Sequence, residues 1–434
     1  MKFPGRRNTK HYFPVTEKDR GSLLLGDLDT SKSDVYVVGI DQLLVDIEIE
    51  VEDKFLEDYL FSKGQSFLIA DEVADEIYTK FKREGKITGE YPGGAIGNTL
   101  HNYSVLSDVS SYALGAIKRQ IEVGDYAFKY LSKTSGLVDM SYLQPSEKPM
   151  GRALCFITPD LERTFAISKG CMNELSTDYI PEEIIAKSAA LLISAYTLRS
   201  NKDPIYLATI KACSIAKKYN VPVVMSLGTS DLVQERCEFL KGFIQSNVTV
   251  LAMNQQEAIA LTSIDDPLQA AEKMLDICDM VLVTVGKKGL YLGAYTDDEY
   301  KRRTKEPLVT KSIVSYNEFE YSRGMRRSSC KKPLKVYSHI SPFNGGPSTI
   351  KNTNGAGDAA LSALLHDISA NCYHKDVVPN SPKHNSQYLT YSSISQISKY
   401  ANRVSFEVLN QNSPRLLKGL PEKEDSLDEG YWSK

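Results

Sequence analysis

Short apolar runs alternate with helix-forming stretches through the middle of the chain, and this alternation restricts the fold more than any other feature. The four clearest runs, each the length of one strand, lie at Ala189–Tyr196, Val221–Leu227, Val248–Met253 and Met280–Val285. Helical patterns at residues 206–219 and 267–277 lie among them. A strand that is apolar throughout must be covered on both faces, and helices that connect parallel strands provide that cover. The alternation predicts an α/β fold with a mostly parallel central sheet and helices on both faces.

The first part of the chain carries strand patterns of a second kind. Val35–Ile40 is a continuous apolar run, whereas residues 44–51 alternate apolar and acidic side chains. Such alternation is typical of a strand with one exposed face. Residues 71–84 have the spacing of an amphipathic helix, and residues 151–168 contain two strand-like runs around a turn at Pro159-Asp160.

Three segments do not fit these patterns. Residues 1–34 and 411–434 are polar, and we interpret them as an N-terminal extension and a C-terminal tail around one domain at residues 35–410. Residues 296–350 interrupt the alternation and are rich in Lys and Arg. A solvent-exposed insertion explains this composition, and an anion-binding role is the alternative.

Composition excludes several classes of function. The 434 residues have a net charge of −3, which argues against binding nucleic acid or a membrane through bulk charge. The apolar runs are too short to span a bilayer, and no apolar signal-peptide core follows the basic N-terminus. The seven cysteines include no Cys-x-x-Cys pair, as expected of a reduced protein without a zinc site. We therefore expect a cytoplasmic protein that binds neither nucleic acid nor membrane.

The strongest local signal is the stretch from Asn354 to Asp358, which reads Asn-Gly-Ala-Gly-Asp directly before an apolar helix pattern. Two glycines allow a tight turn and leave the backbone open to a ligand. The free N–H groups and the positive end of the helix dipole suit a phosphate or a developing negative charge. Asp358 could accept a proton from an attacking hydroxyl. A plain loop with Asp358 as the N-cap of the helix is the alternative.

A second glycine-rich stretch, Tyr91–Asn98, also precedes a helix-like segment. The paired glycines Gly93 and Gly94 permit close backbone contact with a small ligand, and Asn98 offers both a donor and an acceptor. A turn with a helix cap is the alternative.

Two further polar stretches follow strands of the predicted sheet. Asn254 and Glu257 come at the end of one strand, where their oxygens could hold a hydrated Mg²⁺, and a capping box is the alternative. Thr284, Gly286 and Gly289 follow the next strand. There the glycines would let a nucleotide lie across the backbone, and a simple hairpin turn is the alternative.

The order of these motifs along the chain resembles that of the ribokinase-like carbohydrate and nucleoside kinase superfamily. The resemblance rests on Gly-Gly-x-x-x-Asn, Asn-x-x-Glu, Thr-x-Gly and Gly-Ala-Gly-Asp in this order, and it covers roughly residues 35–410. The stretch Leu44–Ile47 is more similar to adenosine kinases than to sugar kinases. The long insertion and the ending Ser413–Leu416 are similar to bacterial purine nucleoside kinases that act on inosine and guanosine.

The resemblance implies a ribokinase-like three-layer fold with a small β-rich lid formed by residues of about 44–52, 88–98 and 136–170. It also implies ATP-dependent transfer of a phosphoryl group to the ribose 5′-hydroxyl of inosine or guanosine, a reaction of purine salvage. Two alternatives stay open. The first is a sugar kinase of the same fold, and the second is a non-catalytic protein that binds a nucleoside or a nucleotide.

The resemblance further implies roles for single residues. Asp358 would be the base, and the backbone amides of Gly355, Ala356 and Gly357 would form an anion hole. The nucleoside would be held by Asp46, Gly93, Gly94, Gly97 and Asn98. The nucleotide would lie against Thr284, Gly286, Gly289, Gly357 and Asn402. Asn254 and Glu257 would organise Mg²⁺ through water.

Several expectations at the site have alternatives. Asp41 competes with Asp46 for the ribose, and Gln42 takes the position of an Asn in the adenosine kinase pattern. Arg199 could meet a substrate or phosphate, or form a surface pair. A monovalent cation such as K⁺ is implied beside the anion hole, near Asn352 and Thr353. The exposed lid sheet could pair with a second copy to form a homodimer.

Overall fold

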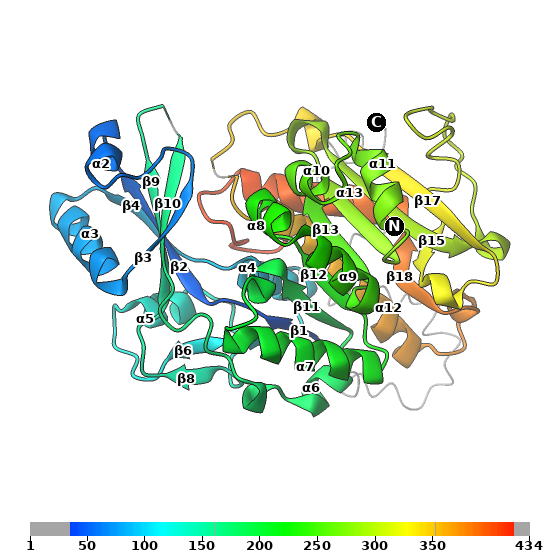
Figure 1. The fold of residues 1–434 in the computed structure, drawn as a ribbon. Helices are drawn as coiled ribbons and strands as arrows, with labels where there is room; N and C mark the ends of the chain where they lie inside the picture. The colour runs from blue at the N-terminus through cyan, green and yellow to red at the C-terminus, as the bar shows by residue number, and fades with distance from the viewer. Residues whose placement is uncertain (1–34, 161, 352, 421–434) are drawn as a thin grey trace.

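A computed structural model describes residues 35–420 with the exception of residues 161 and 352. Within these residues the chain forms one large sheet, a smaller five-stranded sheet and a two-stranded ribbon. Figure 1 shows the small sheet projecting from one end of the large sheet and its helices. None of the described helices combines the length and the apolar character that crossing a membrane requires.

The large sheet contains the strands that the apolar runs predict. Its strands follow the order β18-β16-β15-β14-β13-β12-β11-β1-β5-β7, and β17 pairs with β15. The central strands are parallel to one another, and those from β15 to β18 pair antiparallel. The strands are β1 (Val37–Ile40), β5 (Ser111–Leu114), β7 (Val138–Asp139), β11 (Ala190–Ser194), β12 (Val223–Ser226), β13 (Val250–Asn254), β14 (Met280–Thr284), β15 (Leu290–Asp297), β16 (Arg323–Met325), β17 (Pro333–Ile340) and β18 (Tyr388–Ser393).

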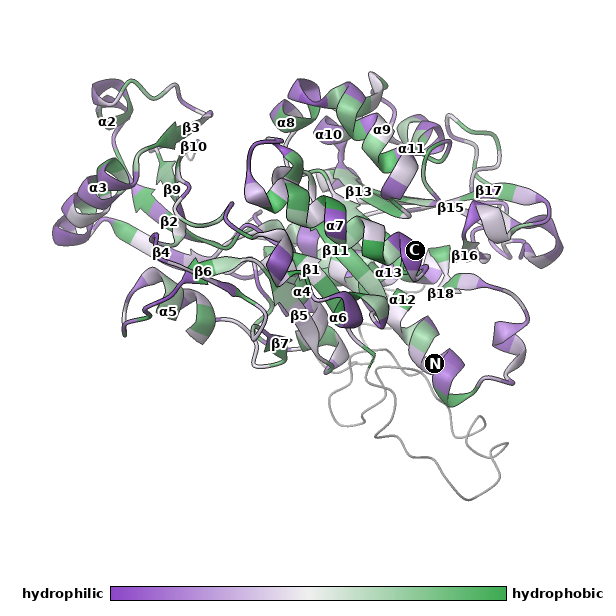
Figure 2. Cartoon of the chain, turned by 60° about the horizontal axis from the view of Figure 1, so that its bottom comes forward, coloured by the Kyte–Doolittle hydropathy of each residue, from purple (hydrophilic) through white to green (hydrophobic). Residues whose placement is uncertain are grey.

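Helices cover both faces of the large sheet, so the expected three-layer α/β architecture is confirmed. Along β14, Val281 and Val283 pack into one apolar cluster, and Met280 and Leu282 pack into the other. The first face carries α6 (Glu182–Ala186), α7 (Pro204–Lys218), α8 (Ser230–Glu235), α9 (Cys237–Asn247), α10 (Gln255–Thr262) and α11 (Pro267–Met274). The second face carries α4 (Ala95–Ser107), α12 (Ala356–Val377) and α13 (Ile394–Leu409). Figure 2 shows apolar strands in the centre and polar residues toward the outside.

The small sheet has the strand order β3-β10-β9-β2-β4 and its own apolar cluster. Val45, Ile47 and Ile49 are fully buried there, whereas the acidic residues between them are not, as the alternation predicts. The sheet consists of β2 (Leu44–Glu50), β3 (Ser66–Ile69), β4 (Ile87–Pro92), β9 (Gly151–Ile157) and β10 (Arg163–Ser168). The neighbouring elements are α2 (Asp53–Asp58), α3 (Asp71–Glu84), α5 (Tyr126–Ser132) and the ribbon of β6 (Ala116–Lys118) and β8 (Gln144–Ser146). The sheet thus draws β3 from residues outside the segments expected for a lid.

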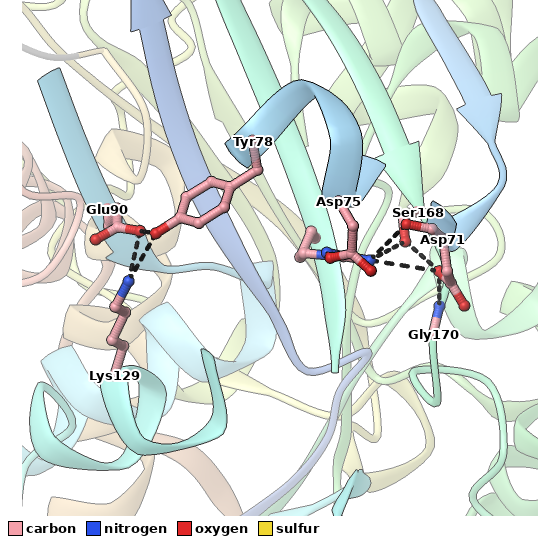
Figure 3. Close-up of polar contacts among 8 residues, drawn as sticks. Asp71, Asp75, Tyr78, Glu90, Lys129, Ser168 and Gly170 are labelled. Carbon is pink, nitrogen blue, oxygen red and sulfur yellow. Dashed lines mark hydrogen bonds and ion pairs between the residues drawn. The ribbon is translucent and has the colours of Figure 1, made fainter. Parts of the chain in front are cut away.

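Polar contacts fix α3 on the small sheet (Figure 3). Arg152 on β9 is only 1% exposed, and its guanidinium bonds Asp75, the carbonyl of Asp71 at 3.1 Å and the hydroxyl of Ser168 at 3.3 Å. The amide of Gly170 donates to the Asp71 carboxylate at 3.3 Å. A buried guanidinium needs such partners, because an unpaired charge in the interior is costly.

A second polar group connects α3 to α5. Glu90 on β4 accepts hydrogen bonds from the Tyr78 hydroxyl and from the Lys129 ammonium, both at 2.6 Å. These bonds lower the pKa of Glu90 in spite of its burial. The sheet, α3 and α5 are therefore held together by charged as well as apolar contacts.

The basic segment at residues 296–350 differs from the expected solvent-exposed insertion. Its strand β17 pairs with β15 along its full length and extends the large sheet. Arg323 on β16 is 7% exposed and bonds the carbonyl of Thr390 and the side chain of Asn371. The prediction was wrong for these strands, because it rested on the composition of the whole segment, whereas each strand contains only one Lys or Arg. The stems of such side chains can be buried while their charged ends find partners.

Candidate active site

The Gly-Ala-Gly-Asp stretch forms the first turn of α12. Gly355 is the N-cap, with φ of 79°, and a Cβ there would lie 2.5 Å from the carbonyl oxygen of Pro414. Both the left-handed conformation and the close approach require glycine. Asp358 is the third residue of the helix, so the alternative reading of Asp358 as N-cap is wrong. The first intrahelical bond runs from the Ala359 amide to Gly355, and the amides before it point out of the helix end.

Asp358 meets Asn98 across 260 residues of sequence. Asn98, on α4 and 5% exposed, places its side-chain Nδ2 3.3 Å from the Asp358 carboxylate. Burial raises the pKa of Asp358 to about 7, the nearby carboxylates of Asp41 and Glu257 raise it too, and the bond from Asn98 opposes the shift. A carboxyl group with a pKa near neutrality can gain and lose a proton under ordinary conditions.

Asp41 lies directly after β1 and is 2% exposed. Its carboxylate accepts a hydrogen bond of 2.7 Å from the Gly97 amide in the first turn of α4. It also lies so close to Gly94 that a Cβ there would be 2.2 Å from the carboxylate oxygen. Burial raises the pKa of Asp41 to about 7 against the effect of these bonds. Asp41 is therefore engaged in capping α4.

Asp46 stands on β2 of the small sheet, at the side of β4 and the glycine-rich turn. It is partly buried, and a Cβ on Gly93 would lie 2.8 Å from its carboxylate. Burial raises its pKa to about 7, and the charge of Arg415 opposes that shift. The structure thus brings carboxylates from β1, β2 and α12 to one place.

Arg415 is a residue of this site that the sequence reasoning missed. It lies after α13 in the segment expected to be a tail, yet it is 2% exposed. Its Nε donates to the Asn98 carbonyl oxygen at 2.9 Å, and its Nη1 donates to the Thr134 hydroxyl at 2.6 Å. The guanidinium lies 4.9 Å from the centre of the Tyr130 ring. The signal was the stretch Ser413–Leu416, which the resemblance had already singled out but which was placed outside the domain.

Gln42 and Arg199 lie at neighbouring strand ends. The Gln42 amide bonds the side chain of Asn173, which donates in turn to Asp203 at 2.9 Å. The Arg199 guanidinium lies 5.7 Å from the ring of Tyr196, just beyond β11. Burial and the charges of Glu257 and Asp358 raise the pKa of Tyr196 to about 12, and the charge of Arg199 opposes this shift.

Asn254 and Glu257 form a capping box at the start of α10. The Glu257 amide donates to the Asn254 side chain at 2.9 Å, and the Glu257 carboxylate accepts from the Asn254 amide at 2.9 Å and from its Nδ2 at 2.8 Å. Burial raises the pKa of Glu257 to about 7. In the described part of the chain no three His, Cys, Asp or Glu side chains cluster as a metal site. Asn254 and Glu257 offer only a few oxygen donors, which suits a divalent ion that keeps most of its bound water.

Gly286 and Gly289 lie in the hairpin turn between β14 and β15, as the simpler of the two interpretations expected. Gly289 has φ of 88°, and a Cβ there would lie 1.9 Å from the carbonyl oxygen of Ile340. Gly286, with φ of 47°, faces open space. Thr284 pairs with Leu290 at the end of β14. Gly289 is thus required by the approach of β17.

Asn402 on α13 joins the same neighbourhood. Its Nδ2 donates to the carbonyl of Ser341 at 2.8 Å, directly after β17. The turn that holds Gly286 and Gly289 therefore lies against the end of β17, and α13 holds the chain that follows it. Asn352 lies outside the described residues.

Comparison with known proteins accounts for this arrangement. The profile of the pfkB family carbohydrate kinases matches residues 67–309. The guanosine-inosine kinase of Escherichia coli (strain K12) is 52% identical over 435 aligned residues, which cover 100% of both chains. The chain belongs to the pfkB carbohydrate kinase family. This pfkB kinase is therefore a phosphotransferase, and kinases of this kind use ATP and typically a divalent metal.

Solved structures of related fold agree with this assignment. An adenosine kinase from Sinorhizobium meliloti is 20% identical, with a TM-score of 0.63 over 89% of this chain and 97% of that one. A probable sugar kinase from Rhizobium etli CFN 42 is 18% identical, with a TM-score of 0.66 over 89% of this chain and 96% of that one. Both likenesses establish the ribokinase-like fold.

Proposed function

We propose that this kinase transfers the γ-phosphoryl group of ATP to the ribose 5′-hydroxyl of guanosine and inosine and yields their 5′-monophosphates. The observation that carries the proposal is the full-length identity of 52% to a guanosine-inosine kinase. The site supports it, because one carboxyl group with a pKa near 7 stands at the free N-terminus of a long helix. Such a reaction supplies nucleotides from purine nucleosides, as in salvage.

Asp358 acts as the base in this proposal. Its carboxylate accepts the proton of the 5′-hydroxyl while the hydroxyl oxygen bonds the γ-phosphorus. The bond from that phosphorus to the bridging oxygen breaks, and ADP leaves. The amides of Gly355, Ala356 and Gly357 face the charge that develops on the phosphoryl oxygens, and the α12 dipole adds to the attraction.

Asp46 is our choice for the ribose hydroxyls, with Asp41 in a structural role. The Asp41 carboxylate already accepts a hydrogen bond from the Gly97 amide in the first turn of α4. The Asp46 carboxylate accepts none from the described residues, so it is available to a ligand. Gly93 and Gly94 then offer an open backbone to the nucleoside between the two carboxylates. Gly97 and Asn98 lie behind them in the first turn of α4, where their backbone amides are bonded to Asp41 and Gly94, and Gln42 and Arg199 border the nucleoside.

The nucleotide is proposed to lie over Thr284, Gly286 and Asn402, with Gly357 at its phosphates. Glycine is required at position 289 because β17 approaches it closely. In the proposed nucleotide site, Gly289 contributes only its backbone. Mg²⁺ supplies charge neutralisation when bound, and Glu257 and Asn254 are the residues that would hold it through water. A monovalent cation such as K⁺ beside Thr353 is part of the same proposal.

The test is an acceptor panel of guanosine, inosine, adenosine, ribose and fructose with Mg-ATP. We expect turnover of guanosine and inosine and a loss of about 10²-fold to 10⁴-fold in Asp358→Asn. Asp376→Asn, an exposed position at the other end of α12, is the matched control and keeps activity. Turnover of the sugars alone would establish a sugar kinase, and no turnover of any acceptor would establish a binding protein.

Two further expectations belong to this proposal. All seven cysteines are free in the described chain, which suits a cytoplasmic enzyme. A homodimer would form through the edges of the small sheet, β3 and β4, where backbone groups are open to pairing. Sedimentation equilibrium decides between monomer and dimer.

A further inference from the structure

Arg415 is a buried cation that the proposed mechanism does not use. The charged groups that face Asp358 are Asp41, Glu257 and Arg415, so one cation stands among several carboxylates at this place. Asn98 and the ring of Tyr196 are the neutral polar groups beside them. A buried guanidinium next to a reacting carboxylate needs an explanation, because its desolvation is costly.

Two of the three guanidinium nitrogens of Arg415 are engaged within the protein. Its Nε and Nη1 are bonded to Asn98 and Thr134, and a Cβ on Gly97 would lie 3.0 Å from its Nη2. Nη2 has no hydrogen-bond partner among the described residues. The guanidinium is thus enclosed beside the first turn of α4. Asn98 connects it to the base, because Asn98 contacts both Arg415 and Asp358.

Arg415 determines the orientation of the Asn98 side-chain amide. A guanidinium has donors and no acceptor, so the Asn98 group that faces it must be the carbonyl oxygen. The Asn98 NH₂ group then faces Asp358, where only a carboxylate or the acceptor side of a carboxyl can receive it. A flipped amide would instead present its carbonyl oxygen to Asp358 and favour the protonated acid.

The chain segment that carries Arg415 is held in place independently. The Leu416 amide donates to Asn102 at 2.8 Å, and the Leu416 carbonyl is 2.9 Å from His101 Nε2. The Ser135 amide donates to His101 Nδ1 at 3.0 Å, so Nε2 carries the proton. On the other side of Arg415, the Pro414 carbonyl accepts a hydrogen bond of 3.5 Å from Asn102 Nδ2. These contacts hold the backbone independently of the bond between Arg415 and Asn98.

We propose that Arg415 is a positioning residue for phosphoryl transfer: it holds the Asn98 amide in the orientation that donates to Asp358 and keeps the base in its carboxylate form. The inference rests on the role of Asp358 in the proposed function. It assigns a task to the C-terminal segment 413–416, which lies far in sequence from the rest of the site.

The test compares Arg415→Met and Arg415→Lys with the wild type, using whichever acceptor the wild type phosphorylates. We expect kcat to fall by up to about 10²-fold in Arg415→Met, with a smaller change in KM for ATP. The acid limb of the profile of kcat/KM against pH moves to higher pH, because Asp41 and Glu257 then act on Asp358 unopposed. Arg415→Lys keeps the positive charge, so the acid limb stays where it is in the wild type. Lysine lacks the rigid donor geometry that orients the Asn98 amide, so kcat remains below that of the wild type.

A double-mutant cycle and one control distinguish this role from simple stability. At a pH above the acid limb, where Asp358 is ionised in every variant, Arg415→Met in an Asn98→Ala background is expected to cost little further kcat, because Arg415 positions the base through Asn98. Asn102→Ala loosens the same segment without touching that bond, so it lowers Tm and leaves the acid limb in place. Effects on kcat that multiply, or an acid limb that moves in Asn102→Ala and not in Arg415→Met, would overturn the inference.

The outcome for Asp358→Asn separates this inference from the proposed function. Full activity in that variant overturns the base and the role of Arg415 with it. An inactive Asp358→Asn together with unchanged kcat and pH profile in both Arg415 variants overturns the role of Arg415 alone.

Discussion

Asp41 and Asp46 carry the same side chain five positions apart, and their contacts separate them. Asp41 caps α4 at 2.7 Å, and Asp46 lies against Gly93 on the small sheet. The sequence left the two as competitors, because the spacing between a strand and its first carboxylate does not show which helix end will approach. Our proposal of Asp46 for the ribose rests on the placement of α4.

Asp46→Asn is the first prediction at this scale. We expect KM for the nucleoside to rise about 10-fold to 100-fold, since a hydrogen bond to a charged group contributes about 1.5–3 kcal/mol, with KM for ATP unchanged. Asp41→Asn serves as the control, and its main effect is a lower Tm. Steady-state kinetics with each substrate varied in turn measures both, and an unchanged nucleoside KM in Asp46→Asn contradicts the assignment.

The same variant carries a prediction about stability. The pKa of Asp46 rises on folding to about 7, so folding favours its protonated form, and this contribution is lost as pH rises from about 4 to 7. Asn cannot ionise, so Asp46→Asn should raise Tm more at pH 8 than at pH 5. Thermal melts at the two values, without ligand, measure this. An equal change at both would show that Asp46 keeps an ordinary pKa.

The pH dependence of activity follows from Asp358. Its pKa of about 7 requires kcat/KM to fall as pH drops below 7, because the protonated acid cannot accept the hydroxyl proton. A profile measured from pH 5 to 9 shows this acid limb. A flat profile down to pH 5 would mean that ionisation of Asp358 does not control the reaction.

At the scale of elements, the sequence predicted the parallel strands and the helices between them, and the structure confirms both. Continuous apolar runs and helical periodicity are local signals, so β11 to β14 could be placed from them. The strands β16 and β17 were missed because the segment was interpreted from its overall basic composition, although each strand contains only one Lys or Arg. The segment 413–416 was missed for a different reason, since its burial depends on α4, which is more than 300 residues away.

The turn between β14 and β15 supplies the prediction at this scale. Gly289→Ala should cost about 3 kcal/mol or more in unfolding free energy, because the new Cβ meets the Ile340 carbonyl at 1.9 Å and φ is 88°. Gly286→Ala, which meets nothing within 4 Å, should cost about 1–2 kcal/mol through its φ of 47° alone. Urea denaturation of the two variants compares them. Equal losses would place the strain in the turn itself and not in the approach of β17.

At the scale of the whole molecule, the site joins parts that lie far apart in sequence. Asp46 comes from the small sheet, Asp358 from the large domain and Arg415 from the end of the described chain, and Asn98 on α4 contacts the last two. The order of motifs predicted that these parts belong to one kinase. The contacts themselves could not be predicted, since spacing along the chain says nothing about which side chains meet. The near-neutral composition fits an enzyme that attracts ATP locally, through one helix end, and binds an uncharged nucleoside.

The measurement that tests the central claim most directly is proton-coupled ³¹P NMR of the product formed from guanosine and Mg-ATP. Phosphate on the 5′-oxygen couples to the two protons of the 5′-carbon, so we predict a new triplet with the appearance of ADP. A doublet, which a phosphate on the 2′- or 3′-oxygen gives, would contradict the placement of the 5′-hydroxyl at Asp358. Release of ADP with inorganic phosphate alone would contradict nucleoside phosphorylation altogether.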